Sequence, residues 1–128
     1  MPTCITHGIK IVVQTRYEPD HSNPVENKYI FSYHIGITNE SEETVQLLSR
    51  HWYIIDSCGT KREVKGEGVV GEQPIIEPGG QHTYVSWCPF ESEIGMMKGF
   101  FTMEKLIDGE LIEVRVPNFT MCAKQRLN

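Results

Sequence analysis

Gly66, Gly68 and Gly71 have the spacing Gly-x-Gly-x-x-Gly, which in dinucleotide-binding proteins holds a pyrophosphate against the start of a helix. That chemistry requires a helix after the last glycine, because the first amides of the helix and its dipole bind the anion. No helix can follow here, since Pro74 and Pro78 lack amide donors and clash with a preceding helical turn. The spacing therefore predicts a glycine-rich loop between strands and excludes a dinucleotide-binding helix.

Two interpretations of this loop stay open. In the first, the glycines serve only the backbone of a tight turn or bulge, and Gly68 takes a positive φ that a β-carbon would strain. In the second, the loop binds an anion, such as pyrophosphate or a nucleotide, with its amides from Gly68 to Gly71 and the planar guanidinium of Arg50. The anion-binding candidates are then Arg50, Gly66, Gly68 and Gly71.

Arg50 also has a purely structural alternative. The chain contains 17 acidic and 12 basic residues, so that carboxylate partners for an arginine are abundant. An ion pair of Arg50 with Glu72 or Asp56 is the preferred interpretation of this residue, and the anion site is the alternative.

No catalytic motif stands out. The sequence has no Gly-x-Ser-x-Gly elbow, no Gly-Lys-Ser/Thr phosphate loop and no His-Glu-x-x-His zinc helix. Glu67, Glu72 and Glu77 on the glycine-rich loop can share acid and base roles with His51, but solvated loop charges are the preferred interpretation. We therefore expect a binding protein without a cofactor, and an enzyme that handles nucleotide polyphosphates is the alternative.

Cysteines and histidines are dispersed. The four cysteines form no Cys-x-x-Cys pair and are expected to be free thiols. A zinc site assembled from distant ligands, such as His51, His82 and a thiol, is the lesser alternative, and no metal site is predicted.

The composition limits the partners. The 128 residues fit one domain, residues 1–128, and the net charge of −5 disfavours a nucleic acid, whose phosphates need a basic surface. No apolar run is long enough to cross a bilayer, and the first residues lead into no signal-peptide core. A cytoplasmic protein without a membrane partner is expected.

The elements that must position these residues are strands. Apolar residues alternate over 9–17 and 29–38, whereas 45–56 is apolar on both parities, which indicates a central strand covered on both faces or a strand with a bulge. Trp52 is predicted to lie in the core. A polar loop is expected at 18–24, and Asp108-Gly109 favours a two-residue hairpin turn. The pattern predicts an all-β fold, an antiparallel sandwich of about seven or more strands related to fibronectin type III and immunoglobulin-like domains.

Several ordered blocks of residues make the chain resemble the bacterial ApaG family, also called CorD. The blocks are residues 47–52 (Leu-Leu-Ser-Arg-His-Trp), 66–74 (Gly-Glu-Gly-Val-Val-Gly-Glu-Gln-Pro), 78–79 (Pro-Gly), Tyr84, Ser86, 95–99 (Gly-Met-Met-Lys-Gly) and 117–119 (Pro-Asn-Phe). The resemblance implies a fibronectin type III-like β-sandwich and a link to cobalt and magnesium efflux. It also implies a protein-interaction module, because similar domains occur in larger eukaryotic proteins, including F-box proteins.

The resulting hypothesis is a small non-enzymatic binding domain linked to divalent-cation homeostasis, which binds pyrophosphate or a nucleotide at the glycine-rich loop. A protein-interaction module is the alternative. Its partner, or a second copy of the chain, would bind at an exposed sheet edge such as that around Trp87 and Phe90.

Overall fold

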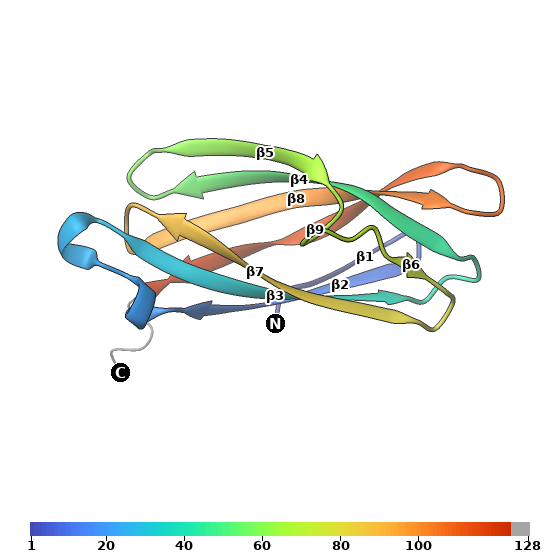
Figure 1. Ribbon diagram of the computed structural model, residues 1–128, viewed down its shortest axis with the longest axis horizontal. Coiled ribbons are helices and arrows are strands. Elements are labelled where there is room, and N and C mark those ends of the chain that lie inside the picture. Colours follow the sequence, from blue (N-terminus) through green and yellow to red (C-terminus); the bar gives the residue numbers. More distant parts are fainter. Residues whose placement is uncertain (124–128) are drawn as a thin grey trace.

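Two antiparallel sheets face each other in the computed structural model, which describes residues 1–123 (Figure 1). The first sheet has the order β1-β2-β3-β7, with β1 Thr3–Thr6, β2 Ile9–Tyr17, β3 Tyr29–Asn39 and β7 Gln81–Phe90. The second has the order β5-β4-β8-β9, with β4 Val45–Asp56, β5 Lys61–Glu67, β8 Ile94–Lys105, β9 Leu111–Cys122 and a short β6, Ile75–Ile76, paired with β4. The predicted all-β antiparallel sandwich is confirmed.

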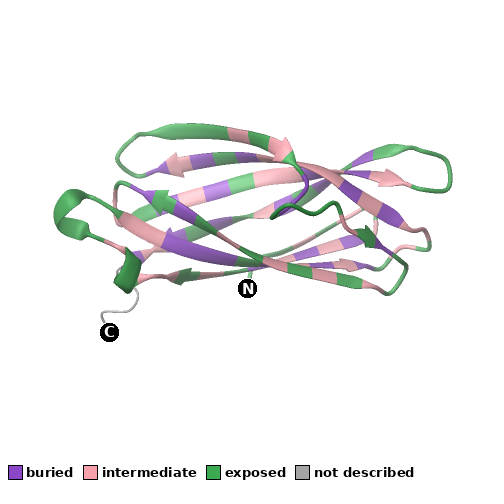
Figure 2. Cartoon of the chain, viewed as in Figure 1, coloured by how far each residue is buried: buried purple, intermediate pink, exposed green. Residues whose placement is uncertain are grey.

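The core lies between the sheets because alternate residues of each strand point inward (Figure 2). Trp52 belongs to this core and is only 3% exposed. Its ring makes edge-on contacts with Tyr33, Phe101 and Phe119, at centroid distances of 5.7, 6.1 and 5.9 Å. The prediction that Trp52 is a core residue is confirmed.

A bulge in β4 explains why its apolar residues fall on both parities. The pairing of β4 with β8 shifts register between Leu47 and Ser49, so that the inward positions change from odd to even numbers. Leu47 and Trp52 are therefore both buried, while Tyr53 is 36% exposed on the outer face. The bulge interpretation is confirmed, and the expectation of protein on both faces is wrong. The same shift places Arg50 on the inward parity.

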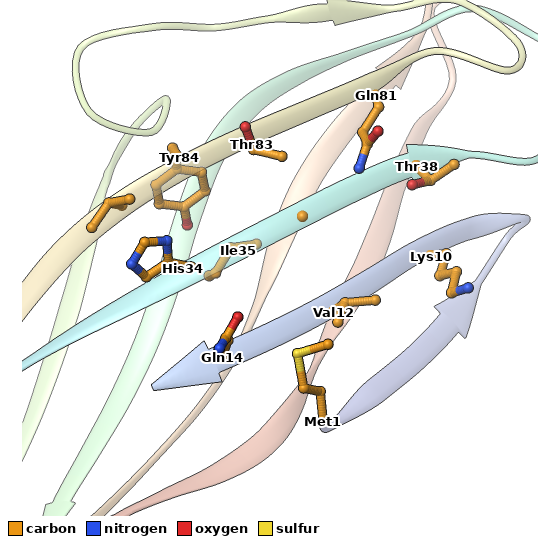
Figure 3. A pocket seen from close by; sticks show the side chains of 12 residues that line it. Met1, Lys10, Val12, Gln14, His34, Ile35, Thr38, Gln81, Thr83 and Tyr84 are labelled. Atoms are coloured by element: carbon orange, nitrogen blue, oxygen red, sulfur yellow. The ribbon is translucent and has the colours of Figure 1, made fainter. Parts of the chain in front are cut away.

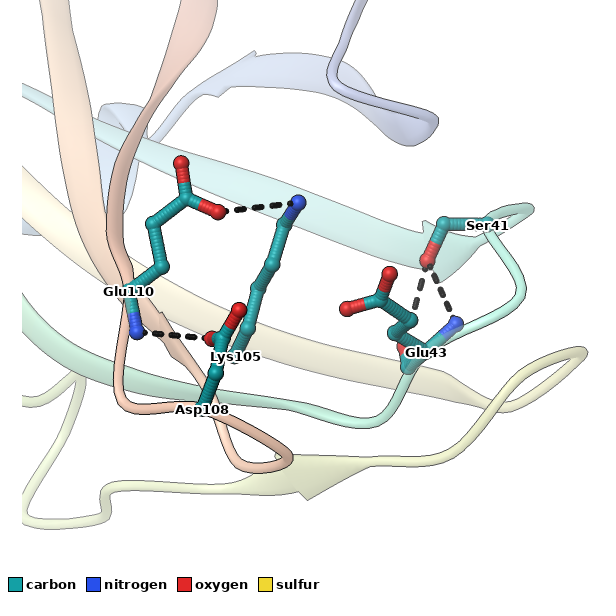
Figure 4. Close-up of polar contacts among 5 residues, drawn as sticks. All are labelled: Ser41, Glu43, Lys105, Asp108 and Glu110. Carbon is teal, nitrogen blue, oxygen red and sulfur yellow. Dashed lines mark hydrogen bonds and ion pairs between the residues drawn. The ribbon is translucent and has the colours of Figure 1, made fainter.

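The hairpin between β8 and β9 is longer than predicted. Residues 106–110 connect the strands, and Gly109, with φ +76°, donates its amide to the carbonyl of Lys105 at 2.8 Å. Asp108 Oδ1 accepts the amide of Glu110 at 2.9 Å, and Lys105 Nζ lies 3.3 Å from Glu110 Oε1 (Figure 4). The predicted two-residue Asp-Gly turn is wrong, because the aspartate side chain supplies a turn of its own and widens the loop.

Two further features concern the first strands. Residues 18–27 form the expected polar connection, which contains two short 3₁₀ turns, Pro19–His21 and Pro24–Glu26, without buried residues. Strand β1 was not expected, and it pairs with β2 across a turn in which His7 and Gly8 both have positive φ.

Within residues 1–123 no helix has the length and apolar character needed to span a membrane.

Candidate anion site

The glycine-rich loop folds into a two-residue hairpin turn. Val69 and Glu72 exchange both backbone hydrogen bonds, at 2.8 and 3.0 Å, and the intervening Val70 and Gly71 have φ of +49° and +79°. Two consecutive positive φ values are the signature of a type I′ turn. The chain then continues through Pro74 into β6 rather than a helix, which confirms the exclusion of a dinucleotide-binding helix.

Gly68 occupies the most restricted backbone position of the loop. Its φ is +64°, as predicted, and a β-carbon there would lie 2.2 Å from the carbonyl oxygen of Glu72. Gly71 also has a positive φ, but a β-carbon there would meet nothing within 4 Å. Gly66 has a different role, since its missing side chain makes room for a guanidinium: a β-carbon would lie 2.7 Å from Arg50 Nη2.

Arg50 binds backbone carbonyls of the loop. Its Nη1 donates to the carbonyl oxygens of Glu67 and Gly68, each at 2.9 Å, and the guanidinium lies over Gly66. The predicted carboxylate partners are engaged elsewhere. Glu72 Oε2 lies 3.8 Å from His82 Nε2, and Asp56 accepts the amide of Glu91 at 2.6 Å and the hydroxyl of Ser92. The expected ion pair of Arg50 with an acid is therefore wrong, because the loop carbonyls are its structural partners.

The loop amides are largely committed to the fold. The Gly68 amide donates to the carbonyl of Leu48 at 2.8 Å, and the amides of Val69 and Glu72 bond across the turn. Of the four amides from Gly68 to Gly71, those of Val70 and Gly71, at the tip of the turn, lack a hydrogen-bond acceptor among the residues that the structure describes. Of the amides from Gly68 to Gly71 that were predicted to bind an anion, those of Val70 and Gly71 thus remain available.

A cavity of about 440 Å³ opens beside Arg50, at the seam where β7 of one sheet faces β4 and the turn of the other. Its polar lining comes from Arg50, Tyr33, Tyr84 and Ser86, and its apolar lining from Trp52, Val69, Val70, Val85 and Trp87. Nε and Nη2 of Arg50 have no hydrogen-bond partner within residues 1–123, and neither has the buried hydroxyl of Tyr84. A buried hydroxyl without a partner is costly, and Tyr84 and Arg50 line the same cavity.

The tyrosines of the cavity remain protonated. Burial raises the pKa of Tyr84 far above its ordinary value, and the positive charge of Arg50 offsets only part of this effect. Burial also raises the pKa of Tyr33, although its hydrogen bond with the Ser86 hydroxyl acts in the opposite direction. Both hydroxyls are therefore hydrogen-bond donors at neutral pH, which suits an anion.

The other candidate groups lie elsewhere. His51 is on the outer face of β4, where its ring stacks on that of Tyr53 with a centroid distance of 4.7 Å. Its Nε2 lies 2.5 Å from Glu63 Oε2. Its carboxylate partner is thus Glu63, and not Glu67 at the end of β5 or Glu72 and Glu77 on the loop, all three of which are exposed.

The zinc ligands considered as the lesser alternative are also not brought together, since His82 lies near Glu72 and not near His51. Within residues 1–123, the side chains close enough to share an ion are Asp56, Cys58 and Glu91. Burial favours the neutral form of Asp56, but hydrogen bonds from Ser92, Glu91 and Cys58 outweigh it and hold the pKa of Asp56 below its ordinary value. This carboxylate is already satisfied by Cys58 in its own turn and by Glu91 and Ser92 in the connection between β7 and β8.

Two other surfaces lie outside this cavity, one on the outer face of the first sheet and one at its β7 edge. A shallow hollow of about 580 Å³ lies on the outer face of β2, β3 and β7, lined by polar side chains such as Gln14, His34 and Gln81 (Figure 3). It contains none of the predicted site residues. The predicted edge patch is only half present, because Trp87 is 48% exposed, whereas Phe90 is 2% exposed and packs on Phe31. The alternation along β7 places these two residues on opposite faces.

Comparison with known proteins identifies the family. A family model described as the ApaG domain matches residues 19–105. A protein ApaG from Methylobacterium radiotolerans is 45% identical over 116 residues, 91% of this chain and 88% of the relative. A protein ApaG from Brucella suis biovar 1 is 43% identical over 121 residues, 94% of this chain and 92% of the relative.

Solved structures agree. The crystal structure of the putative ApaA protein from Bordetella pertussis has a TM-score of 0.88 and 35% identity, and covers 97% of each chain. The C-terminal domain of wzt, with a TM-score of 0.55 and 11% identity over 94% of this chain and 75% of that one, shares the fold alone. The family model, the curated relatives and the solved structure thus agree that the chain belongs to the ApaG domain family.

Proposed function

We propose that this chain is a non-enzymatic binding domain that holds a small anion, pyrophosphate or the phosphates of a nucleotide, in the cavity beside Arg50. The observation that supports it is the pairing of two unused donor groups in one cavity. Arg50 is fixed by two carbonyls through Nη1 alone, and the Tyr84 hydroxyl is buried without a partner. An anchored guanidinium is pre-organised for phosphate oxygens, so little entropy is lost on binding.

The predicted site is revised in its composition. Arg50 stays its centre, Gly66 gives the guanidinium room, and Gly68 and Gly71 shape the turn. The donors we assign to the anion are Arg50, Tyr84 and the amides at the tip of the turn.

The lining of the cavity favours binding over catalysis. It includes no carboxylate and no histidine among the described residues, and its tyrosines have raised pKa values. A group able to take a proton from water at neutral pH is what hydrolysis of a nucleotide polyphosphate would need. We therefore prefer a binding domain to an enzyme of this class.

The proposed ligand also suggests how the chain connects to divalent cations, the setting that the family resemblance implies. Mg²⁺ binds phosphate oxygens and retains several of its waters, so that pyrophosphate and nucleotides exist in cells largely as metal complexes. We propose that the domain takes up such a complex through its phosphates, without protein ligands to the metal.

Isothermal titration calorimetry tests this proposal. Wild-type protein is titrated with pyrophosphate, ATP and a dinucleoside polyphosphate, each with and without Mg²⁺. Tyr84→Phe keeps the ring and removes the hydroxyl, so it should leave the melting temperature equal or higher and weaken anion binding roughly tenfold or more, the value of a hydrogen bond to a charged group.

Arg50→Lys should weaken binding as well, but also lower stability, because lysine cannot reproduce both carbonyl contacts. Arg115→Lys, at an exposed position of β9, is the matched control and should bind as the wild type does. The proposal is refuted if none of the three ligands binds at millimolar concentration, or if Tyr84→Phe binds as tightly as the wild type.

A further inference from the structure

Strand β5 forms an open edge of the second sheet. It pairs with β4 on one side and, within residues 1–123, with no strand on the other. The amide of Asp56 bonds to the carbonyl of Thr60, and that of Gly68 to the carbonyl of Leu48, so the even-numbered residues between them direct their backbone groups to β4. The odd-numbered residues of β5 therefore direct their amides and carbonyls away from the sheet.

The charges of β5 are complementary to those of a second copy of the same strand that runs in the opposite direction. In the strand Lys-Arg-Glu-Val-Lys-Gly-Glu, from Lys61 to Glu67, Val64 is the central residue. If a second copy runs antiparallel about Val64, Lys61 lies opposite Glu67, and Glu63 lies opposite Lys65. Each odd position then faces the opposite charge, and the two-fold axis makes every such pair occur twice.

We propose that the β5 edge is a homodimer interface, in which two copies of this chain pair antiparallel about Val64 and join their sheets into one. The odd-numbered residues would exchange backbone hydrogen bonds, and the two Val64 side chains would meet as a close pair on the inward face. This assignment does not depend on the anion site.

Two observations on the single chain favour a second copy as the occupant. Lys61 and Glu67 are exposed, and their side chains have no partner among the described residues, although both lie on a well-formed strand. Val64 is only partly buried and packs at the margin of the core, where a second Val64 would cover it. The Glu67 carbonyl already accepts a hydrogen bond from Arg50, and its second lone pair remains for the partner.

The competing interpretation is an edge whose charges prevent association. The two interpretations predict different results on charge reversal. If the charges pair across a two-fold axis, reversal of one weakens the dimer and reversal of both restores it. If the charges only prevent other chains from pairing with this edge, the wild type is a monomer and neither change has an effect on association.

Sedimentation equilibrium at low and high salt measures the association. The wild type should be a dimer whose affinity falls with salt, Lys61→Glu should weaken it roughly tenfold or more, and Lys61→Glu with Glu67→Lys should recover most of the loss. Lys10→Glu, on a strand of the other sheet, is the control and should leave the dimer unchanged. Circular dichroism checks that each variant is folded.

Amide hydrogen exchange locates the interface in the same samples. The amides of Glu63 and Lys65 should be protected in concentrated protein and exposed on dilution, whereas those of Arg62 and Val64, bonded to β4, should be protected throughout. A monomeric wild type at high concentration, a dimer that the double reversal does not restore, or equal exchange at Glu63 and Val64 at all concentrations overturns the inference.

Discussion

Replacement of Gly68 by alanine should be among the glycine-to-alanine substitutions that most reduce the free energy of unfolding of this chain. Two separate costs arise at this position. A left-handed backbone costs a residue with a β-carbon about 1–2 kcal/mol, and φ of Gly68 is +64°. The new carbon would also lie 2.2 Å from the Glu72 carbonyl oxygen, so the turn must move and its two Val69–Glu72 hydrogen bonds must stretch or break, at about 1 kcal/mol each. The sum is roughly 3–4 kcal/mol.

Gly71→Ala is the matched control for this change. Its φ is +79°, so the backbone cost is the same, but a β-carbon there meets nothing within 4 Å. Chemical denaturation should therefore show a loss of about 1–2 kcal/mol for Gly71→Ala and about 2 kcal/mol more for Gly68→Ala. Unchanged slopes with denaturant concentration would show that both variants unfold from a similarly compact state.

Equal losses for the two variants would refute the reasoning, because they would mean that the crowding at Gly68 has no energetic consequence. A loss below about 1 kcal/mol at both positions would contradict the left-handed backbone itself.

Three further predictions concern other residues. Trp52→Ala should cost roughly 3–5 kcal/mol in chemical denaturation, since a large buried ring is lost from the core; a cost under about 1 kcal/mol would contradict its position. Val70→Asn should stabilise by up to about 1 kcal/mol, because asparagine tolerates the φ of +49° better than a β-branched residue; a clear loss of melting temperature would argue against the type I′ turn. The pKa of Asp56 is lowered in the folded state, so its stabilising effect is present above its ordinary pKa of 3.8 and is lost as the pH falls through the lower folded value. The difference in stability between the wild type and Asp56→Asn should therefore shrink as the pH falls through the lowered pKa of Asp56, and parallel curves would refute this linkage.

The sequence was sufficient for the architecture because alternation and turn residues report the environment of each strand directly. The phase change at Leu47 to Trp52 correctly indicated a bulge, and the Gly-rich spacing with its prolines correctly indicated a turn. The hairpin at residues 106–110 differs from the predicted two-residue turn, because an aspartate side chain can replace a backbone acceptor and lengthen the loop.

The partners of Arg50 could not be read from the sequence. Charge composition favours a carboxylate, but the bulge turns Arg50 to the inward parity, where the carbonyls of Glu67 and Gly68 are within reach. Likewise, nothing in the sequence shows that the Gly68 amide is used by Leu48, or that Tyr84 ends in a buried hydroxyl without a partner. These are results of the pairing between strands distant in sequence. A signal that was available is the match of Tyr84 and Ser86 to the family blocks.

The most direct measurement of the central claim is a pyrophosphate titration followed by ¹H–¹⁵N correlation spectra of the uniformly labelled wild type. The proposed site predicts that the Arg50 Nε–Hε signal and the amides of Val70 and Gly71 shift together along one saturable curve, while the Arg115 side-chain signal stays in place. Saturable shifts confined to other surfaces, such as the hollow beside His34, or the absence of any shift at millimolar pyrophosphate, would contradict the claim that this cavity binds an anion.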